Sequence, residues 1–272
     1  MTVGEWLAHA QQTLEAAGID TARLDALVLA EDALDKNRTH LLAHPELVLT
    51  TAQENVLAGQ LSRRAKHEPL AYLRSRTEFY GREFIVTPAV LEPRPESETM
   101  IELLLQQTGL PAKPYIADIG TGSGALGITA ALELKNASVD LLEIDPAAIE
   151  VARMNVIKHT TSISVIKSDL LADAPRNYDV LLCNLPYVPD NFHINEAARR
   201  EPEIAIFGGG DGLDLYRRLF KQIDILQIKP LLILCESLPP QHELLAAVAN
   251  ASNYHQAQES DFIQLFTFQP GN

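Results

Sequence analysis

Five short apolar runs, separated by segments with helical spacing, constrain the fold of this chain more than any other feature. Runs of this length bounded by turn residues are typical of buried strands. Strands that alternate with helices favour a doubly wound, mainly parallel sheet. The sequence therefore predicts an α/β domain over residues 93–272, with strands at residues 115–118, 139–143, 163–166, 180–183 and 231–236.

The first 75 residues carry a different pattern, in which apolar residues recur at helical spacing and no long strand pattern occurs. Thr2 with Glu5 and Thr51 with Glu54 predict two capping boxes, each at the start of a helix. We therefore expect a small all-helical domain over residues 1–75.

Residues 76–92 alternate apolar and polar side chains around Gly81, which predicts a β-hairpin. The chain is thus expected to consist of the helical domain, this hairpin linker and the α/β domain of residues 93–272.

Composition narrows the class of partner and the compartment. The net charge of -14 opposes non-specific binding to nucleic acid, and 46% apolar residues suffice for a large core. No basic leader and no apolar run of membrane-spanning length occurs, so we expect a cytoplasmic protein.

Cys183 and Cys235 lie in apolar runs and are expected to be reduced core thiols. The histidines show no metal-ligand spacing, so no metal site is predicted.

A glycine-rich loop follows the first apolar run and leads into a helix. Glycines let backbone approach a ligand closely, and the N–H groups at a helix start favour polar or anionic groups. Glu143, at the end of the second run, is placed to hold ribose hydroxyls. The pattern fits the dinucleotide fingerprint as well, so it predicts a cofactor that carries a nucleoside and leaves its identity open. The loop residues are Gly120, Thr121, Gly122, Ser123 and Gly124.

Two acidic residues favour S-adenosylmethionine (SAM) over a dinucleotide. Asp118, just before the glycine loop, would repel a phosphate and attract an ammonium group, which SAM carries. Asp169 follows the third run, where a carboxylate can accept a hydrogen bond from the adenine amine.

The turn Asn184-Leu185-Pro186-Tyr187 follows the fourth run. Pro186 fixes its own φ and favours extended backbone at Leu185. The Asn184 side-chain oxygen and the Leu185 carbonyl can then accept hydrogen bonds from a planar NH2 group, against which Tyr187 would pack. This turn, the glycine loop and the acids are all expected at the carboxyl edge of the sheet, where open α/β folds bind ligands.

The chain resembles the HemK/PrmC family, the N5-glutamine methyltransferases of peptide chain release factors. The resemblance covers most of residues 1–240 and includes Pro93-Arg94-Pro95-Glu96, the glycine loop and the Asn-x-Pro-Tyr turn. Leu185 stands where the family turn has its first proline, and Glu143 stands where the family has a ribose-binding Asp.

The resemblance implies a Rossmann-like SAM-dependent methyltransferase domain that transfers a methyl group to the side-chain nitrogen of a glutamine in a release factor. It also implies that the helical domain docks this partner, and we expect a monomer. The turn residues Asn184, Leu185, Pro186 and Tyr187 would be catalytic. The cofactor would be held by Asp118, Gly120, Thr121, Gly122, Ser123, Gly124, Glu143, Asp169, the Leu170 backbone and Asn184.

Three alternatives remain open. The acceptor could be a glutamine of another protein, such as a ribosomal protein. An amine of adenine or cytosine in nucleic acid is a second possibility, which the net charge opposes. A docking protein that binds SAM without catalysis is the third.

Overall fold

The computed structural model describes residues 1–270 and divides the chain into two compact units. The first unit comprises residues 1–75 together with residues 194–200, and the second comprises residues 76–193 and the described residues from 201 onward. Within the described part of the chain, no helix has the length and apolar character needed to cross a membrane.

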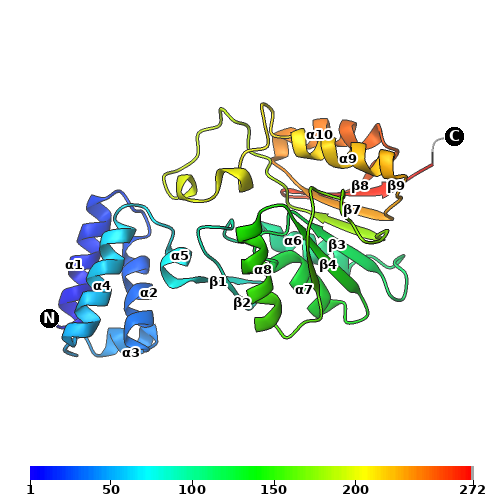
Figure 1. Cartoon of the computed structure of the whole chain (residues 1–272). Helices are drawn as coiled ribbons and strands as arrows, with labels where there is room; N and C mark the ends of the chain where they lie inside the picture. Colours follow the sequence, from blue (N-terminus) through cyan, green and yellow to red (C-terminus); the bar gives the residue numbers. More distant parts are fainter. Residues whose placement is uncertain (271–272) are drawn as a thin grey trace. The chain divides into compact units, whose positions relative to one another are not determined.

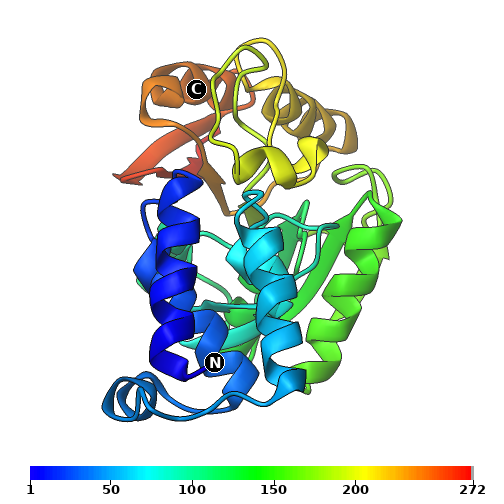
Figure 2. The ribbon, with the colours of Figure 1, turned by 90° about the vertical axis from the view of Figure 1, so that its left-hand side faces the viewer.

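The first unit is helical, and α1, α2 and α4 lie side by side in it (Figures 1 and 2). Thr2 and Glu5 form the predicted capping box at the start of α1. The predicted box of Thr51 with Glu54 is wrong: Thr50, whose backbone is extended, caps α4 together with Gln53. Both registers fit the sequence pattern, and the backbone of residue 50 decides between them. The helices are α1 (Val3–Ala16), α2 (Ala22–Leu34), α3 (Arg38–Ala43), α4 (Thr51–Arg64) and α5 (Leu70–Arg74).

The second unit is built on a seven-stranded sheet of order β5-β4-β3-β6-β7-β9-β8. Neighbouring strands from β5 through β7 are parallel, whereas β9 runs antiparallel to both β7 and β8. The α/β, mainly parallel fold is confirmed, but β8 and β9 were not predicted, and β9 is buried almost throughout by its neighbours. The strands are β3 (Tyr115–Ile119), β4 (Ser138–Glu143), β5 (Ser164–Lys167), β6 (Val180–Cys183), β7 (Leu232–Glu236), β8 (Tyr254–Ser260) and β9 (Ile263–Phe268).

Helices cover both faces of this sheet, as Figure 1 shows. One core joins α6, α7 and α8 to the side chains on one face, and a second core joins α9 and α10 to the other. Burial on both faces explains why the central strand β6 is apolar along its whole length. These helices are α6 (Glu98–Leu105), α7 (Ala125–Glu133), α8 (Pro146–Lys158), α9 (Asp214–Leu226) and α10 (His242–Asn250).

The hairpin pairs β1 (Arg76–Phe79) with β2 (Arg82–Ile85). It is shorter than the predicted 76–92 segment, and the residues after β2 are irregular up to the 3-10 helix η1 (Pro95–Ser97). Phe79 and Phe84 are buried in the core beneath α6 and α7, so the hairpin belongs to the second unit.

Gly127 lies where α7 packs most tightly against the sheet. A Cβ at this position would lie 2.2 Å from Leu141 Cδ2 and 2.9 Å from Asp118 Cβ. Because both neighbours are buried, we expect Gly127→Ala to lower the free energy of unfolding in urea by about 1–3 kcal/mol.

Gly59→Ala in α4 is the matched control, because a Cβ there would meet nothing within 4 Å. Helix propensity predicts that this control gains up to about 1 kcal/mol. Equal stability of the two variants would contradict the packing described for α7.

Candidate active site

The register of the sheet places the ends of three parallel strands beside one another. Ile119 at the end of β3 pairs with Cys183 at the end of β6, and Cys183 pairs with Cys235 in β7. A cleft with a volume of about 260 Å³ opens at this edge. Among the predicted site residues, all of which lie in the described part of the chain, Gly124 and Tyr187 do not line the cleft. Those that line it are Asp118, Gly120, Thr121, Gly122, Ser123, Glu143, Asp169, Leu170, Asn184, Leu185 and Pro186.

The glycine loop is tied to the end of β4. The N–H groups of Gly120 and Thr121 both donate to the carbonyl of Leu142, at 2.8 and 3.1 Å. Gly120 has φ +66°, and a Cβ there would lie 3.0 Å from Leu185 Cδ2. A side chain at position 120 would therefore strain the backbone and press on the turn after β6.

Glu143 is buried, and its carboxylate organises the loops on either side. Oε2 accepts the N–H of Gly122 at 2.9 Å, while Oε1 accepts those of Ile144 and Asp145 at 2.8 and 3.0 Å. The carboxylate thus joins the glycine loop to the turn before α8.

Asp118 is 1% exposed, and two groups of the adjacent segment bind its carboxylate. The Thr121 hydroxyl and the Gly127 N–H, the latter at 2.8 Å, both donate to Oδ2. Burial raises the pKa of Asp118 to about 6, and the Glu143 charge adds to this shift while the two hydrogen bonds oppose it. Asp118 therefore changes its charge close to neutral pH.

Asp169 is half-exposed at the cleft and forms an ion pair with Arg218 of α9 at 2.6 Å. Leu170 follows with φ +55°, and Gln222 binds this segment through the carbonyl of Asp169 and the N–H of Leu171. Arg218 also lines the cleft. The sequence did not indicate Arg218, since it lies 49 residues from Asp169 and matches no motif.

Asn184 is tied to two buried residues that sequence reasoning also missed. Its Nδ2 donates to Ser97 Oγ at 2.9 Å, and the Ser97 hydroxyl donates to Glu236 Oε2 at 2.6 Å. The Tyr187 hydroxyl donates to the other Glu236 oxygen at 3.0 Å, so the Tyr187 side chain is directed toward Glu236. Burial raises the pKa of Tyr187, and the Glu236 charge adds to that shift.

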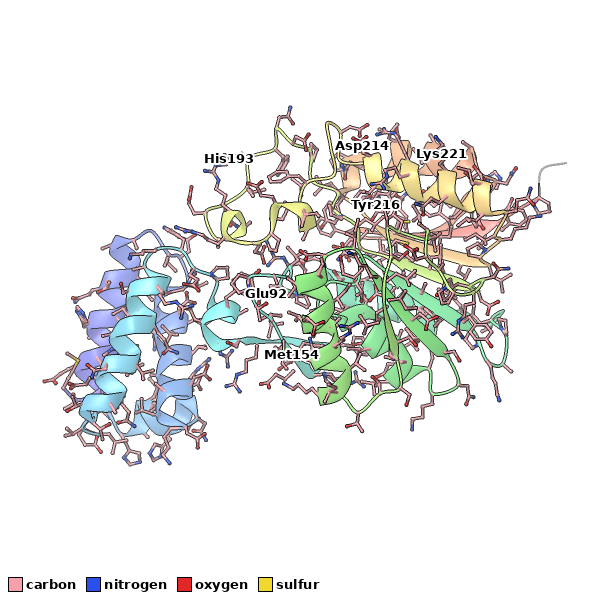
Figure 3. The ribbon with its side chains drawn as sticks, in the orientation of Figure 1. Glu92, Met154, His193, Asp214, Tyr216 and Lys221 are labelled. Atoms are coloured by element: carbon pink, nitrogen blue, oxygen red, sulfur yellow. The ribbon has the colours of Figure 1, made fainter. Side chains whose placement is uncertain are left out.

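Leu185 contributes more than a carbonyl, because its side chain is 2% exposed and packs in the core beneath α9. The hydroxyl of Tyr216, which lies on α9 (Figure 3), is close to the Leu185 backbone. The same hydroxyl contacts the carbonyls of Cys183 and Glu236. Tyr216 thus joins the ends of β6 and β7.

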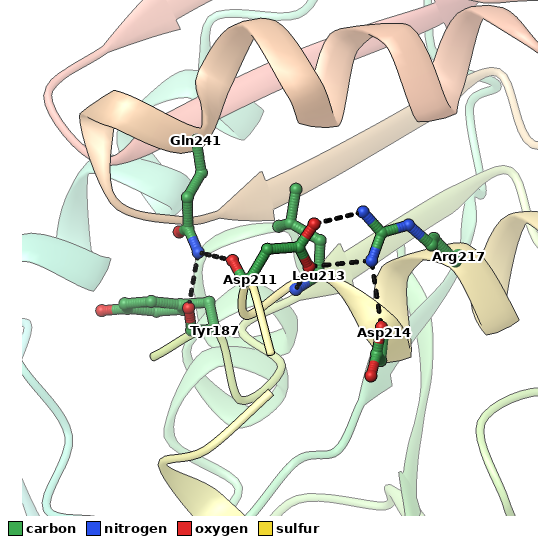
Figure 4. Close-up of polar contacts among 6 residues, drawn as sticks. All are labelled: Tyr187, Asp211, Leu213, Asp214, Arg217 and Gln241. Carbon is green, nitrogen blue, oxygen red and sulfur yellow. Dashed lines mark hydrogen bonds and ion pairs between the residues drawn. The ribbon is translucent and has the colours of Figure 1, made fainter. Parts of the chain in front are cut away.

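A second set of contacts holds the backbone after the turn, as Figure 4 shows. Gln241 Nε2 donates to the carbonyls of Tyr187 and Asp211 at 2.8 and 2.7 Å, and Arg217 forms an ion pair with Asp211. Gly212 packs so closely that a Cβ would lie 2.0 Å from the Tyr187 carbonyl oxygen. Glycine is therefore required at position 212 for the loop to approach the turn.

Glu201 connects the residues after the hairpin to the cleft region within the second unit. It is 5% exposed, accepts the N–H of Glu92 at 3.1 Å and forms an ion pair with Arg94. Burial raises the pKa of Glu201, and Arg94 opposes that shift.

Cys183 and Cys235 are free and buried. Across residues 1–270, no group of three or more His, Cys, Asp or Glu side chains is arranged to hold a metal ion.

Two known protein domains match separate parts of the chain. Residues 5–74 match the PrmC N-terminal domain, and residues 96–200 match the methyltransferase small domain. The chain is 34% identical over 229 residues to the release factor glutamine methyltransferase of Koribacter versatilis, covering 82% of this chain and 81% of that protein. It is 38% identical over 225 residues to that of Moorella thermoacetica, with coverages of 80% and 79%.

Solved structures share the fold at low identity. The hMettl16 catalytic domain in complex with the MAT2A 3′UTR hairpin 6 has a TM-score of 0.55 at 18% identity, covering 78% of this chain and 82% of that one. A methyltransferase from Pyrococcus furiosus has a TM-score of 0.51 at 16% identity, with coverages of 77% and 98%.

This fold, with a glycine loop and an Asn-x-Pro-Tyr turn at adjacent strand ends, defines the class of SAM-dependent methyltransferases. Sequence identity above 30% over 80–82% of the chain narrows the assignment from this class to one family. The chain belongs to the family of the release factor glutamine methyltransferases, which are SAM-dependent protein glutamine methyltransferases.

Glu143→Gln tests the organising role of this carboxylate. A glutamine presents an NH2 group to backbone N–H donors that need an acceptor, so we expect the free energy of unfolding in urea to fall by about 1–3 kcal/mol. Glu150→Gln on the exposed side of α8 is the control, and we expect it to change stability by less than about 0.5 kcal/mol. Equal effects of the two substitutions would contradict the role of Glu143.

Proposed function

We propose that this protein transfers the methyl group of SAM to the side-chain amide nitrogen of a glutamine in a peptide chain release factor. The observation that carries the proposal is that Asn184, Leu185 and Pro186 line the same cleft as the glycine loop. The release factor as substrate is supported by the relatives described above, which are release factor glutamine methyltransferases.

The cleft residues fit the chemical groups of SAM. A Cβ at Gly122 would meet no atom within 4 Å, so open space lies beside the loop. Glu143 uses three backbone N–H donors, and a carboxylate has about four acceptor sites, which leaves capacity for a ribose hydroxyl. Asp118 would attract the positively charged amino group of the methionine part.

The adenine end of the cofactor is assigned to Asp169 and the backbone of Leu170. Asp169 already binds Arg218, so its carboxylate would accept the adenine amine beside this guanidinium. Since Arg218 also lines the cleft, we add it to the residues that hold the adenine end.

The chain's contribution to the chemistry is mainly to orient the acceptor. A carboxamide nitrogen is a poor nucleophile because its lone pair is delocalised into the carbonyl. The Asn184 oxygen and the Leu185 carbonyl would each accept one amide hydrogen, which directs the nitrogen and favours positive charge that develops on it. SAM supplies an activated methyl group through its sulfonium leaving group.

Residues 1–75 are proposed to dock the protein substrate, because they form the helical unit that matches the PrmC N-terminal domain. The net charge of -14 favours a partner with a basic surface and opposes a nucleic acid substrate.

Methyl transfer from tritiated SAM to a purified release factor tests the proposal. We expect one glutamine to be labelled and to be identified by mass spectrometry of the digested product. Labelling of a ribosomal protein instead would show that the methyl acceptor is a glutamine of that protein. Labelling of RNA or DNA would refute the protein substrate altogether.

Asn184→Ala should lower the rate of this transfer by at least about a hundredfold, because it removes a preorganised polar group that faces the acceptor. Binding of SAM, measured by calorimetry, should persist. Asn136→Ala, in an exposed turn of the same unit, is the matched control and should retain the wild-type rate.

The affinity for SAM should depend on pH through Asp118. Below its pKa of about 6 the carboxyl group gains a proton and loses the charge that attracts an amino cation. We therefore expect the Kd for SAM to rise by up to about tenfold between pH 7 and pH 5. Asp118→Asn should weaken binding at pH 7 and flatten this profile; an unchanged profile in the variant would assign the pH dependence to another group.

A further inference from the structure

A chain of hydrogen bonds runs from the end of β7 to the Asn184 side chain. Glu236 and Ser97 are 1% and 2% exposed. Ser97 donates to Glu236 at 2.6 Å and accepts the Asn184 NH2 group at 2.9 Å. Ser97 and Asn184 line the cleft, whereas Glu236 lies behind them.

The donor and acceptor roles in this chain follow from the chemistry of the carboxylate. Both oxygens of Glu236 accept a hydroxyl proton, one from Tyr187 and one from Ser97, so the single proton of the Ser97 hydroxyl is committed to Glu236. The Ser97 oxygen is then left with lone pairs alone and binds the NH2 end of the Asn184 amide. Oδ1 of Asn184 must therefore point away from Ser97.

The Glu236 carboxylate is itself held from several sides. The second carboxylate oxygen accepts the Tyr187 hydroxyl at 3.0 Å. The backbone carbonyl of Glu236 accepts the hydroxyl of Tyr216 on α9 (Figure 3). Burial raises the pKa of Glu236, and the nearby Glu96 adds to this shift. The hydrogen bonds from Ser97 and Tyr187 oppose it by stabilising the ionised form.

We propose that Ser97 and Glu236 are positioning residues that hold the Asn184 carboxamide in the one orientation in which Oδ1 accepts a hydrogen bond from the substrate amide. The effect of this orientation on methyl transfer rests on the proposed function, whereas the orientation itself is set within the protein. The two orientations of an amide have the same shape, so packing alone does not select between them. The reversed orientation would present NH2 to an NH2 group.

The orientation is tested without substrate by NMR of protein labelled with ¹⁵N-asparagine. The Asn184 side-chain NH2 signals are assigned by their loss in Asn184→Asp. In the wild type one proton should be shifted downfield and exchange slowly with solvent. Ser97→Ala and Glu236→Gln should move these signals and accelerate exchange by about tenfold, the factor that one hydrogen bond of ordinary strength provides.

Ser252→Ala is the matched control, because Ser252 is also buried and its hydroxyl donates to a carboxylate, that of Asp224, at 2.8 Å. It should leave the Asn184 signals unchanged. If Ser97→Ala and Glu236→Gln move these signals no more than Ser252→Ala does, the inference is overturned. Thermal unfolding of each variant establishes that the compared proteins are folded.

Methyl transfer provides the second measurement. Ser97→Ala and Glu236→Gln should lower kcat by about tenfold or more while KM for the release factor and the Kd for SAM stay unchanged, and Ser97→Thr, which keeps the hydroxyl, should recover part of kcat. A loss that falls on KM instead would overturn the positioning role. If the wild type methylates no release factor but the NMR signals respond as expected, the proposed function fails and the orientation of Asn184 stands.

Discussion

The lateral register of three parallel strands is the constraint on which the rest of the site depends. Ile119, Cys183 and Cys235 lie in one row across β3, β6 and β7, so the residues that follow them, Gly120, Asn184 and Glu236, emerge side by side. A slip of one residue would exchange the side chains that pack against α6, α7 and α8 with those that pack against α9 and α10, and the two cores differ in their side chains. Burial thus determines which groups meet at the edge of the sheet.

Buried carboxylates then convert this row into a defined cleft. Glu143 and Glu201 each accept at least one backbone N–H from a loop that borders it. Asp118 accepts the Thr121 hydroxyl of the glycine loop and the N–H of Gly127 in α7. A carboxylate removed from water needs such donors, and the loops need acceptors, so each contact satisfies both. The acids that the motifs identify therefore also stabilise the loops. Removal of one of these carboxylates would change both the loop structure and the binding of a ligand.

The sequence anticipated the parallel sheet and eleven of the residues that line the cleft, because strand and loop signals are local. It misplaced the cap of α4, where two adjacent threonines fit the same pattern. It also missed β9, whose residues are buried by pairing with β7 and β8 and by packing against helices distant in the chain. Arg218, which belongs to no motif, comes to Asp169 only through the placement of α9.

The amino-acid sequence by itself determined the five parallel strands, the glycine loop and the turn that begins at Asn184, since each depends on residues close together in the chain. Only the tertiary structure decided how these groups are oriented. Ser97 meets Asn184 across 87 residues and Glu236 across 139, and the direction of those hydrogen bonds sets which end of the Asn184 amide faces the cleft. A local sequence pattern specifies the residue type. The orientation of a carboxamide, whose two ends have the same shape, is specified by its hydrogen-bond partners.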